Sequence, residues 1–259
     1  MPRTCGMRTL VALQEDSNCM LLVNGCSFTQ GQHSWPNHLQ RFKQNQIVNL
    51  SCSSAGNTYI HESTINALSR SRAYRAVLVM WSGITRIDTR VSDITRFQNS
   101  WYNSKYSSEH NDWPEKIVEP VNDQDFVDKD WVFSLGEINR DRAVTQSGLF
   151  SGFYKHMEVS QFVFHFLIKL ISLQNTLKVM KLPYCFMFYM SYQKDLQCFP
   201  ELCKLVDWNN VYLEQNIFDI AQTNNDIDST NHPGPDTHKK WADIVDQIIT
   251  NKLLKESQI

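Results

Sequence analysis

The apolar run CMLLV at residues 19–23 ends at Asn24-Gly25 and leads directly into the turn sequence Cys26-Ser27-Phe28-Thr29. A short apolar run bounded by turn residues predicts a β-strand. Because its residues do not alternate with polar ones, we expect a strand that is covered on both faces. Strands of this kind are typical of parallel sheets with helices on either side. The start of the chain therefore predicts an α/β fold.

The rest of the chain continues this pattern of strands and helices. Further apolar runs predict strands at Ile47 to Leu50, Ala76 to Trp81, Tyr184 to Met190 and, more weakly, Asn210 to Leu213. Amphipathic stretches predict helices at His33 to Lys43, Thr58 to Arg72, Phe153 to Met180 and His238 to Leu254. Alternation of strand and helix predicts a parallel sheet. We expect a single domain over residues 1–259, a three-layer α/β/α fold with a flavodoxin-like parallel sheet.

One stretch, Asp88 to Gln146, interrupts the alternation. It is rich in Asn, Asp, Ser and Trp and has little periodicity. A connection of this length predicts a functional loop, a lid or a small subdomain inserted into the domain. Its aromatic residues could stack against a sugar or form the insertion's own small core. They are Trp101, Tyr102, Tyr106, Trp113 and Trp131.

Composition narrows the range of partners. The chain carries 25 Lys and Arg against 27 Asp and Glu, a formal net charge of −2, so it lacks the basic excess typical of nucleic-acid binding. The 7 cysteines are odd in number and form no CxxC pair, which argues against a disulfide framework or a zinc ribbon. Reduced thiols favour a cytoplasmic protein. No apolar segment is long enough for a membrane helix, and we expect no membrane partner, cofactor or metal.

Polar, glycine-containing segments follow the first three predicted strands, and in a parallel sheet ligands bind at that edge. Ser27 lies at a strand-to-helix turn, where free backbone N–H groups could meet a developing oxyanion. Gly56 follows the second strand, where the missing Cβ lets a backbone N–H approach the same atom. A serine nucleophile needs a base, and His232-Pro233 offers one just before the last helix. Ser27 taken alone favours a helix cap, because serine caps are common, and only together with the His-Pro pair does it favour catalysis.

These segments together resemble the SGNH (GDSL-like) hydrolase family. The opening block is Gly25-Cys26-Ser27-Phe28-Thr29, Gly56 matches the second block, and DSTNHPGPDTHKKWA from Asp228 to Ala242 matches the last. The resemblance implies Ser27 as nucleophile, His232 as its base and Asp228 orienting the base, with Asp226 behind it. It also implies that the N–H groups of Ser27 and Gly56 stabilise the oxyanion, and that the substrate is an ester, namely an acylated carbohydrate or another small polar ester.

The chain departs from the family pattern at several points. Cys26 stands where the family has Asp, and we expect its side chain to be buried. The third block, Trp81 to Arg86, lacks the family's oxyanion-hole Asn, which leaves two alternatives: Ser82, Asn57 or a backbone N–H replaces it, or the oxyanion hole is poorer. Asp228 lies one residue earlier than the usual Asp, which leaves Asp226 and Asp236 as alternatives. These departures keep open a non-catalytic ligand-binding module on the same fold, and also an acyltransferase.

Two histidines, His232 and His238, lie close together before and at the start of the last predicted helix. His238 lies six residues after His232, and we expect it to have a structural role in this loop. The carboxylates and histidines between Asp226 and His238 could in principle bind a metal, but their spacing fits no metal-binding motif.

Overall fold

The computed structural model describes residues 20–31, 33–53, 55–70, 74–90, 131–133, 157–229 and 231–253. Its main sheet is five-stranded, in the order β2-β1-β3-β6-β7, and every neighbouring pair is parallel. The strands are β1 (Met20–Asn24), β2 (Ile47–Asn49), β3 (Tyr74–Trp81), β6 (Tyr184–Phe188) and β7 (Val211–Tyr212). Numbered along this sheet the order is 2-1-3-4-5, the flavodoxin-like topology. The predicted α/β fold is confirmed.

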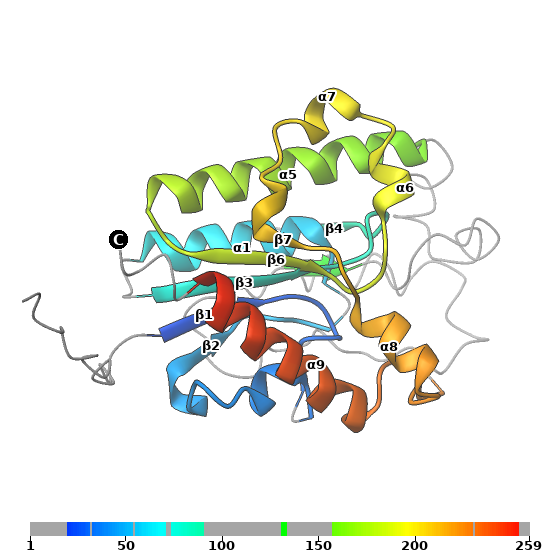
Figure 1. The fold of residues 1–259 in the computed structure, drawn as a ribbon. Coiled ribbons are helices and arrows are strands. Elements are labelled where there is room, and N and C mark those ends of the chain that lie inside the picture. The colour runs from blue at the N-terminus through cyan, green and yellow to red at the C-terminus, as the bar shows by residue number, and fades with distance from the viewer. Residues whose placement is uncertain are drawn as a thin grey trace, which may run out of the picture.

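Helices cover both faces of the sheet (Figure 1). One face carries α1 (Asn57–Ser69) and α5 (Val159–Val179), which contact each other. The other face carries α9 (Pro235–Ile248), which continues into the π-helical turn η4 (Ile249–Leu253) and packs against η1 (Trp35–His38). Short elements make the connections: η2 (Gln44–Gln46), α6 (Gln193–Leu196), α7 (Pro200–Cys203), η3 (Trp208–Asn210) and α8 (Ile217–Thr223).

The strands are mostly apolar, as expected for strands that helices cover on both sides. Residues 21–23 of β1 and 76–81 of β3 are fully buried. Trp81, at the end of β3, meets the rings of Phe166 and Phe186 edge-on, each with centroids 5.5 Å apart. The apolar face predicted for the long helix is also buried, through Phe162, Phe166, Leu170, Leu173 and Leu177. Edge-on ring contacts of this kind stabilise the core beyond the area they bury.

The helix predicted over His33 to Lys43 is wrong. Only Trp35–His38 is helical, as a single 3-10 turn, and Leu39 then turns to an extended conformation. The backbone N–H of Gln40 donates to Asp246 Oδ2 of α9 at 2.8 Å, so a tertiary bond replaces the helical one. Trp35 is nonetheless fully buried, so the apolar side chains find the core without a helix. The last helix begins at Pro235 rather than His238, because proline suits a first helical turn.

Most of the predicted insertion lies outside the described residues, including Trp101, Tyr102, Tyr106 and Trp113. Its described parts are β4 (Asp88–Arg90) and β5 (Trp131–Phe133), which pair antiparallel as a separate two-stranded sheet. Where the structure describes the chain, no helix is both long and apolar enough to cross a bilayer. No disulfide joins any two cysteines in the same described ranges.

Candidate active site

Ser27 lies in a tight turn at the carboxyl end of β1. The N–H groups of Thr29 and Gln30 donate to the carbonyl of Cys26 at 2.8 and 3.2 Å, which folds the chain back around Ser27. Cys26 and Phe28 are buried on either side, as predicted for Cys26, while Ser27 is half-buried. A Cβ on Gly25 would lie 2.3 Å from Thr29 Oγ1, so the turn closes only because this residue has no side chain.

Asn24, the last residue of β1, fastens this turn to α1. Its side-chain amide is fully buried and donates to Ile60 O at 3.0 Å, Ser63 Oγ at 2.8 Å and Thr64 Oγ1 at 2.9 Å. Its Oδ1 accepts the N–H of Gly25 at 2.8 Å. A buried amide with all of these bonds holds a strand end in one orientation. Sequence reasoning treated Asn24 only as a turn residue, because its partners lie some forty positions away.

His232 lies in a short loop that closes on itself. Asp228 Oδ1 accepts the backbone N–H of His232 at 3.0 Å, and the backbone N–H of Asp228 donates to His232 O at 2.9 Å. Asn231 takes a left-handed backbone conformation with φ of 61°, which Asn tolerates better than most residues. Ile227 and Pro233 form a β-bridge below the loop. The main chain of His232 is therefore fixed by local bonds.

The structure brings these two segments together. His232 Nε2 lies 2.8 Å from Ser27 Oγ, although 205 positions separate the residues. The ring of Phe28 packs beside the imidazole with centroids 5.1 Å apart. A hydroxyl and an imidazole at this distance can exchange a proton, which is the geometry that a nucleophilic serine requires. The contact between Ser27 and His232 that the sequence predicts is present.

The three candidate carboxylates have different partners. Asp228 holds the main chain of His232. Asp226 Oδ2 accepts the N–H of Thr237 at 2.7 Å and so caps the start of α9, where a carboxylate is favourable. Asp236 is exposed and pairs with Lys239 at 3.5 Å. Of the three, Asp228 is the one with a described bond to His232.

Gly56 precedes α1 and packs against a carboxylate that the sequence did not point to. Asp88 accepts the N–H groups of Thr58 at 3.1 Å and Tyr59 at 2.7 Å, and so caps α1. A Cβ on Gly56 would lie 2.9 Å from Asp88 Oδ2. Burial raises the pKa of Asp88. No local pattern marks this residue, because its helix lies about thirty positions earlier in the chain.

The side chains of Asn57 and Ser82 do not match the oxyanion-donor role expected of them. The Asn57 amide donates to Ser82 O at 3.3 Å and Gly83 O at 3.1 Å, and its Oδ1 accepts the N–H of Ser82 at 2.9 Å. Ser82 is fully buried, and its hydroxyl has no hydrogen-bond partner among the described residues. These bonds tie the end of β3 to α1. The backbone N–H groups of Ser27 and Gly56 are left as the candidate donors.

The described residues contain no group of three or more His, Cys, Asp or Glu side chains that could hold a metal ion. His238 is buried in α9, and burial, reinforced by the nearby His38, lowers its pKa to about 4. It is therefore neutral at physiological pH. Its Nδ1 has no hydrogen-bond partner in the described part of the chain.

Fold and site together define a class: a flavodoxin-like α/β protein with a serine–histidine pair at the carboxyl edge of its sheet. No protein-family model matches the chain, and no curated protein shows a significant sequence match. Among solved structures, the chain is similar to the psychrotrophic esterase EstA from Pseudoalteromonas sp., in a structure inhibited by monoethylphosphonate. The match has 12% identity and a TM-score of 0.42, and covers 93% of this chain and 99% of that one.

Proposed function

We propose that this protein is a serine hydrolase of the SGNH type that cleaves carboxylic esters. The observation that supports this most strongly is the 2.8 Å contact between Ser27 Oγ and His232 Nε2. The half-buried Ser27, on a turn held by the core, is accessible while its position is fixed. A nucleophile paired with a base in this way is the usual arrangement for acyl transfer.

In the proposed reaction His232 accepts the Ser27 proton as Ser27 Oγ attacks the ester carbonyl carbon. The backbone N–H groups of Ser27 and Gly56 donate to the resulting oxyanion. His232 then gives its proton to the departing alkoxide, which leaves an acyl group on Ser27. Water, deprotonated by His232, releases the acid and restores Ser27. Asp228 acts as a positioning residue, because it holds the main chain of His232.

The substrate proposed is an acylated carbohydrate or another small polar ester. We expect the protein to use no metal or cofactor and to bind neither nucleic acid nor a membrane. Support for this substrate class comes from the resemblance in the sequence and from the aromatic residues of the insertion, and the net charge of −2 is the reason that no nucleic acid is expected. The cysteines, which form no disulfide in the described ranges, are compatible with a reducing cytoplasm, and we place the protein there.

A serine-reactive fluorophosphonate probe tests this proposal. Intact-mass analysis of the folded wild-type protein is expected to show one label on Ser27, and Ser27→Ala should show none. Removal of the base in His232→Gln should slow labelling and ester turnover by about 10³-fold or more. Ser69→Ala, at an exposed position near the end of α1, is the matched control and should label like the wild type.

The same experiment distinguishes the rival functions. Folded wild-type protein that takes no label would identify a ligand-binding module on this fold. Occupation of the Asn57 amide, which leaves the oxyanion to backbone donors alone, is the observation that favours this rival. A labelled protein that transfers acyl groups to an added alcohol faster than to water would instead be an acyltransferase.

A further inference from the structure

Phe28 lies between the two segments that form the candidate active site. It follows Ser27 directly in the turn after β1 and is only 4% exposed. Its ring packs beside the imidazole of His232, with centroids 5.1 Å apart and an angle of 35° between the ring planes. This angle is closer to a stacked arrangement than to an edge-on one. One turn of the chain therefore carries both the nucleophile and an aromatic surface against which the base packs.

The bonds to the main chain of His232 do not by themselves set the direction of its ring. Asp228 Oδ1 accepts the backbone N–H of His232 at 3.0 Å, which fixes the position of the main chain. The imidazole can still rotate about its Cα–Cβ and Cβ–Cγ bonds. An aromatic ring packed beside it restricts this rotation, and in the packed orientation Nε2 lies 2.8 Å from Ser27 Oγ. Phe28 is thus placed to hold the orientation from which the proton is transferred.

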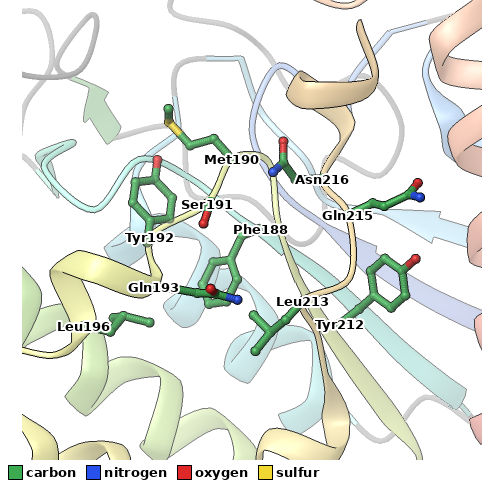
Figure 2. A pocket seen from close by; sticks show the side chains of 10 residues that line it. All are labelled: Phe188, Met190, Ser191, Tyr192, Gln193, Leu196, Tyr212, Leu213, Gln215 and Asn216. Carbon is green, nitrogen blue, oxygen red and sulfur yellow. The ribbon is translucent and has the colours of Figure 1, made fainter. Parts of the chain in front are cut away.

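Further aromatic side chains fix Phe28 in place. The ring of Tyr189, in the loop after β6, lies 4.6 Å from that of Phe28, and Phe218 of α8 meets Phe28 edge-on at 6.4 Å. The N–H of Phe218 donates to Tyr189 O at 3.1 Å, which joins the two supports. Tyr189 also meets Tyr192, which lines a hollow with room for only about 20 Å³, about one water molecule (Figure 2). These contacts leave Phe28 little room to move away from His232.

The contact between the two rings should strengthen as the proposed reaction proceeds. When His232 accepts the Ser27 proton, its imidazole becomes a positively charged imidazolium. The face of a benzene ring attracts a cation that lies within about 6 Å of its centroid, and the separation of 5.1 Å is within this range. The attraction is greater for the imidazolium than for the neutral imidazole, so it stabilises the transition state more than the bound substrate. An interaction of this kind raises kcat and changes KM little.

We infer that Phe28 is a positioning residue, whose ring directs the imidazole of His232 toward Ser27 and stabilises the imidazolium; this rests on the proposed function. As the bond between Ser27 Oγ and the acyl carbon forms, the Ser27 proton passes to His232 Nε2. The same proton then passes to the alkoxy oxygen as the bond between that oxygen and the acyl carbon breaks. Phe28 gives and takes no proton, and it acts only through His232.

Three variants test this inference through ester turnover. Phe28→Leu removes the aromatic face but keeps an apolar side chain, and it should lower kcat about 10-fold while KM stays within about 2-fold of the wild type. Phe28→Tyr keeps the ring and should retain kcat to within about 3-fold. Phe166→Leu is the matched control, because Phe166 of α5 is also buried and also contacts two aromatic rings. It should lower stability and leave kcat within about 2-fold of the wild type.

Other kinetic results overturn the inference. Equal kcat values for Phe28→Leu and Phe166→Leu would make Phe28 a core residue without a part in catalysis. A raised KM with unchanged kcat in Phe28→Leu would assign it to substrate binding instead. If Phe28→Leu does not fold, Phe28→Met removes the ring with a more flexible side chain, and the same outcomes apply to it.

Proton NMR of the His232 ring gives a measurement that needs no turnover, with His232→Gln used to assign the signal. The signal should move in Phe28→Leu, because the ring current of Phe28 is lost, and should stay in place in Phe166→Leu. An unchanged signal in Phe28→Leu would overturn the inference. Wild-type protein that takes no fluorophosphonate label would contradict the hydrolase, whereas the NMR signal tests the ring contact independently.

Discussion

The two segments that meet at the site are held by opposite means. The Ser27 turn is fixed from within the core by buried Asn24, whose side-chain amide donates to three residues of α1 that lie 36 to 40 positions away. The His232 loop is largely exposed and is fixed by bonds between residues a few positions apart, such as Asp228 with His232. The nucleophile therefore depends on the packing of α1 against the sheet, and the base depends on one loop. Changes in the two segments should affect stability and activity differently.

Asn24→Ala should have the largest effect on stability. It removes the bonds to α1 and leaves the buried N–H of Gly25 without its acceptor. We expect a loss of about 2–4 kcal/mol in the free energy of unfolding, measured by urea denaturation. Asn210→Ala, which loses one half-exposed bond to Asp207, is the control and should lose less than about 1 kcal/mol. Equal losses in the two variants would mean that the Ser27 turn is not anchored through Asn24.

Acid should lower the free energy of unfolding, because α9 contains the buried histidine His238. Burial lowers the pKa of His238 to about 4 from its ordinary 6.5, so the unfolded chain takes up a proton that the folded chain resists. Above pH 6.5 His238 is neutral in both states and does not destabilise the fold. As the pH falls from 6.5 to about 4, the free energy of unfolding should decrease by up to about 3 kcal/mol.

This pH dependence should be measured as urea midpoints between pH 7 and 4, and His238→Gln should flatten the curve. His61, whose pKa burial also lowers to about 4, contributes in the same direction, so some slope should remain. A His238→Gln curve as steep as the wild type would show that His238 does not resist protonation in the fold.

Substitution of Asp226 should lower mainly the stability, and substitution of Asp228 should lower mainly the activity. Asp226→Ala removes the cap of α9 and should cost about 1 kcal/mol in stability. Asp228→Ala, at an exposed position, should change stability little but lower kcat/KM about 10-fold, because His232 loses a bond that fixes its main chain. Asp228→Asn keeps an acceptor oxygen and should retain more activity than Asp228→Ala. An inactive Asp226→Ala with full stability would reverse the two assignments.

Ser82→Ala should have the smallest effect. Its hydroxyl is buried without a hydrogen-bond partner among the described residues, so its removal should shift stability by about 0.5 kcal/mol or less. Ester turnover should stay within about 2-fold of the wild type. A loss of 10² or more in kcat would restore Ser82 as an oxyanion donor.

The sequence alone determined the parallel sheet and pointed to Ser27 and His232. Apolar runs, turn residues and the His-Pro pair are local features, and local features can be read from consecutive residues. Only the tertiary structure decided three further features. They are the 2.8 Å contact between Ser27 and His232, the anchoring of the Ser27 turn by Asn24 and the capping of α1 by Asp88. The tertiary structure also decided the loss of the helix expected over His33 to Lys43 and the structural use of Asn57. In each case the deciding bond joins residues far apart in the chain, and no spacing along the sequence specifies such a bond.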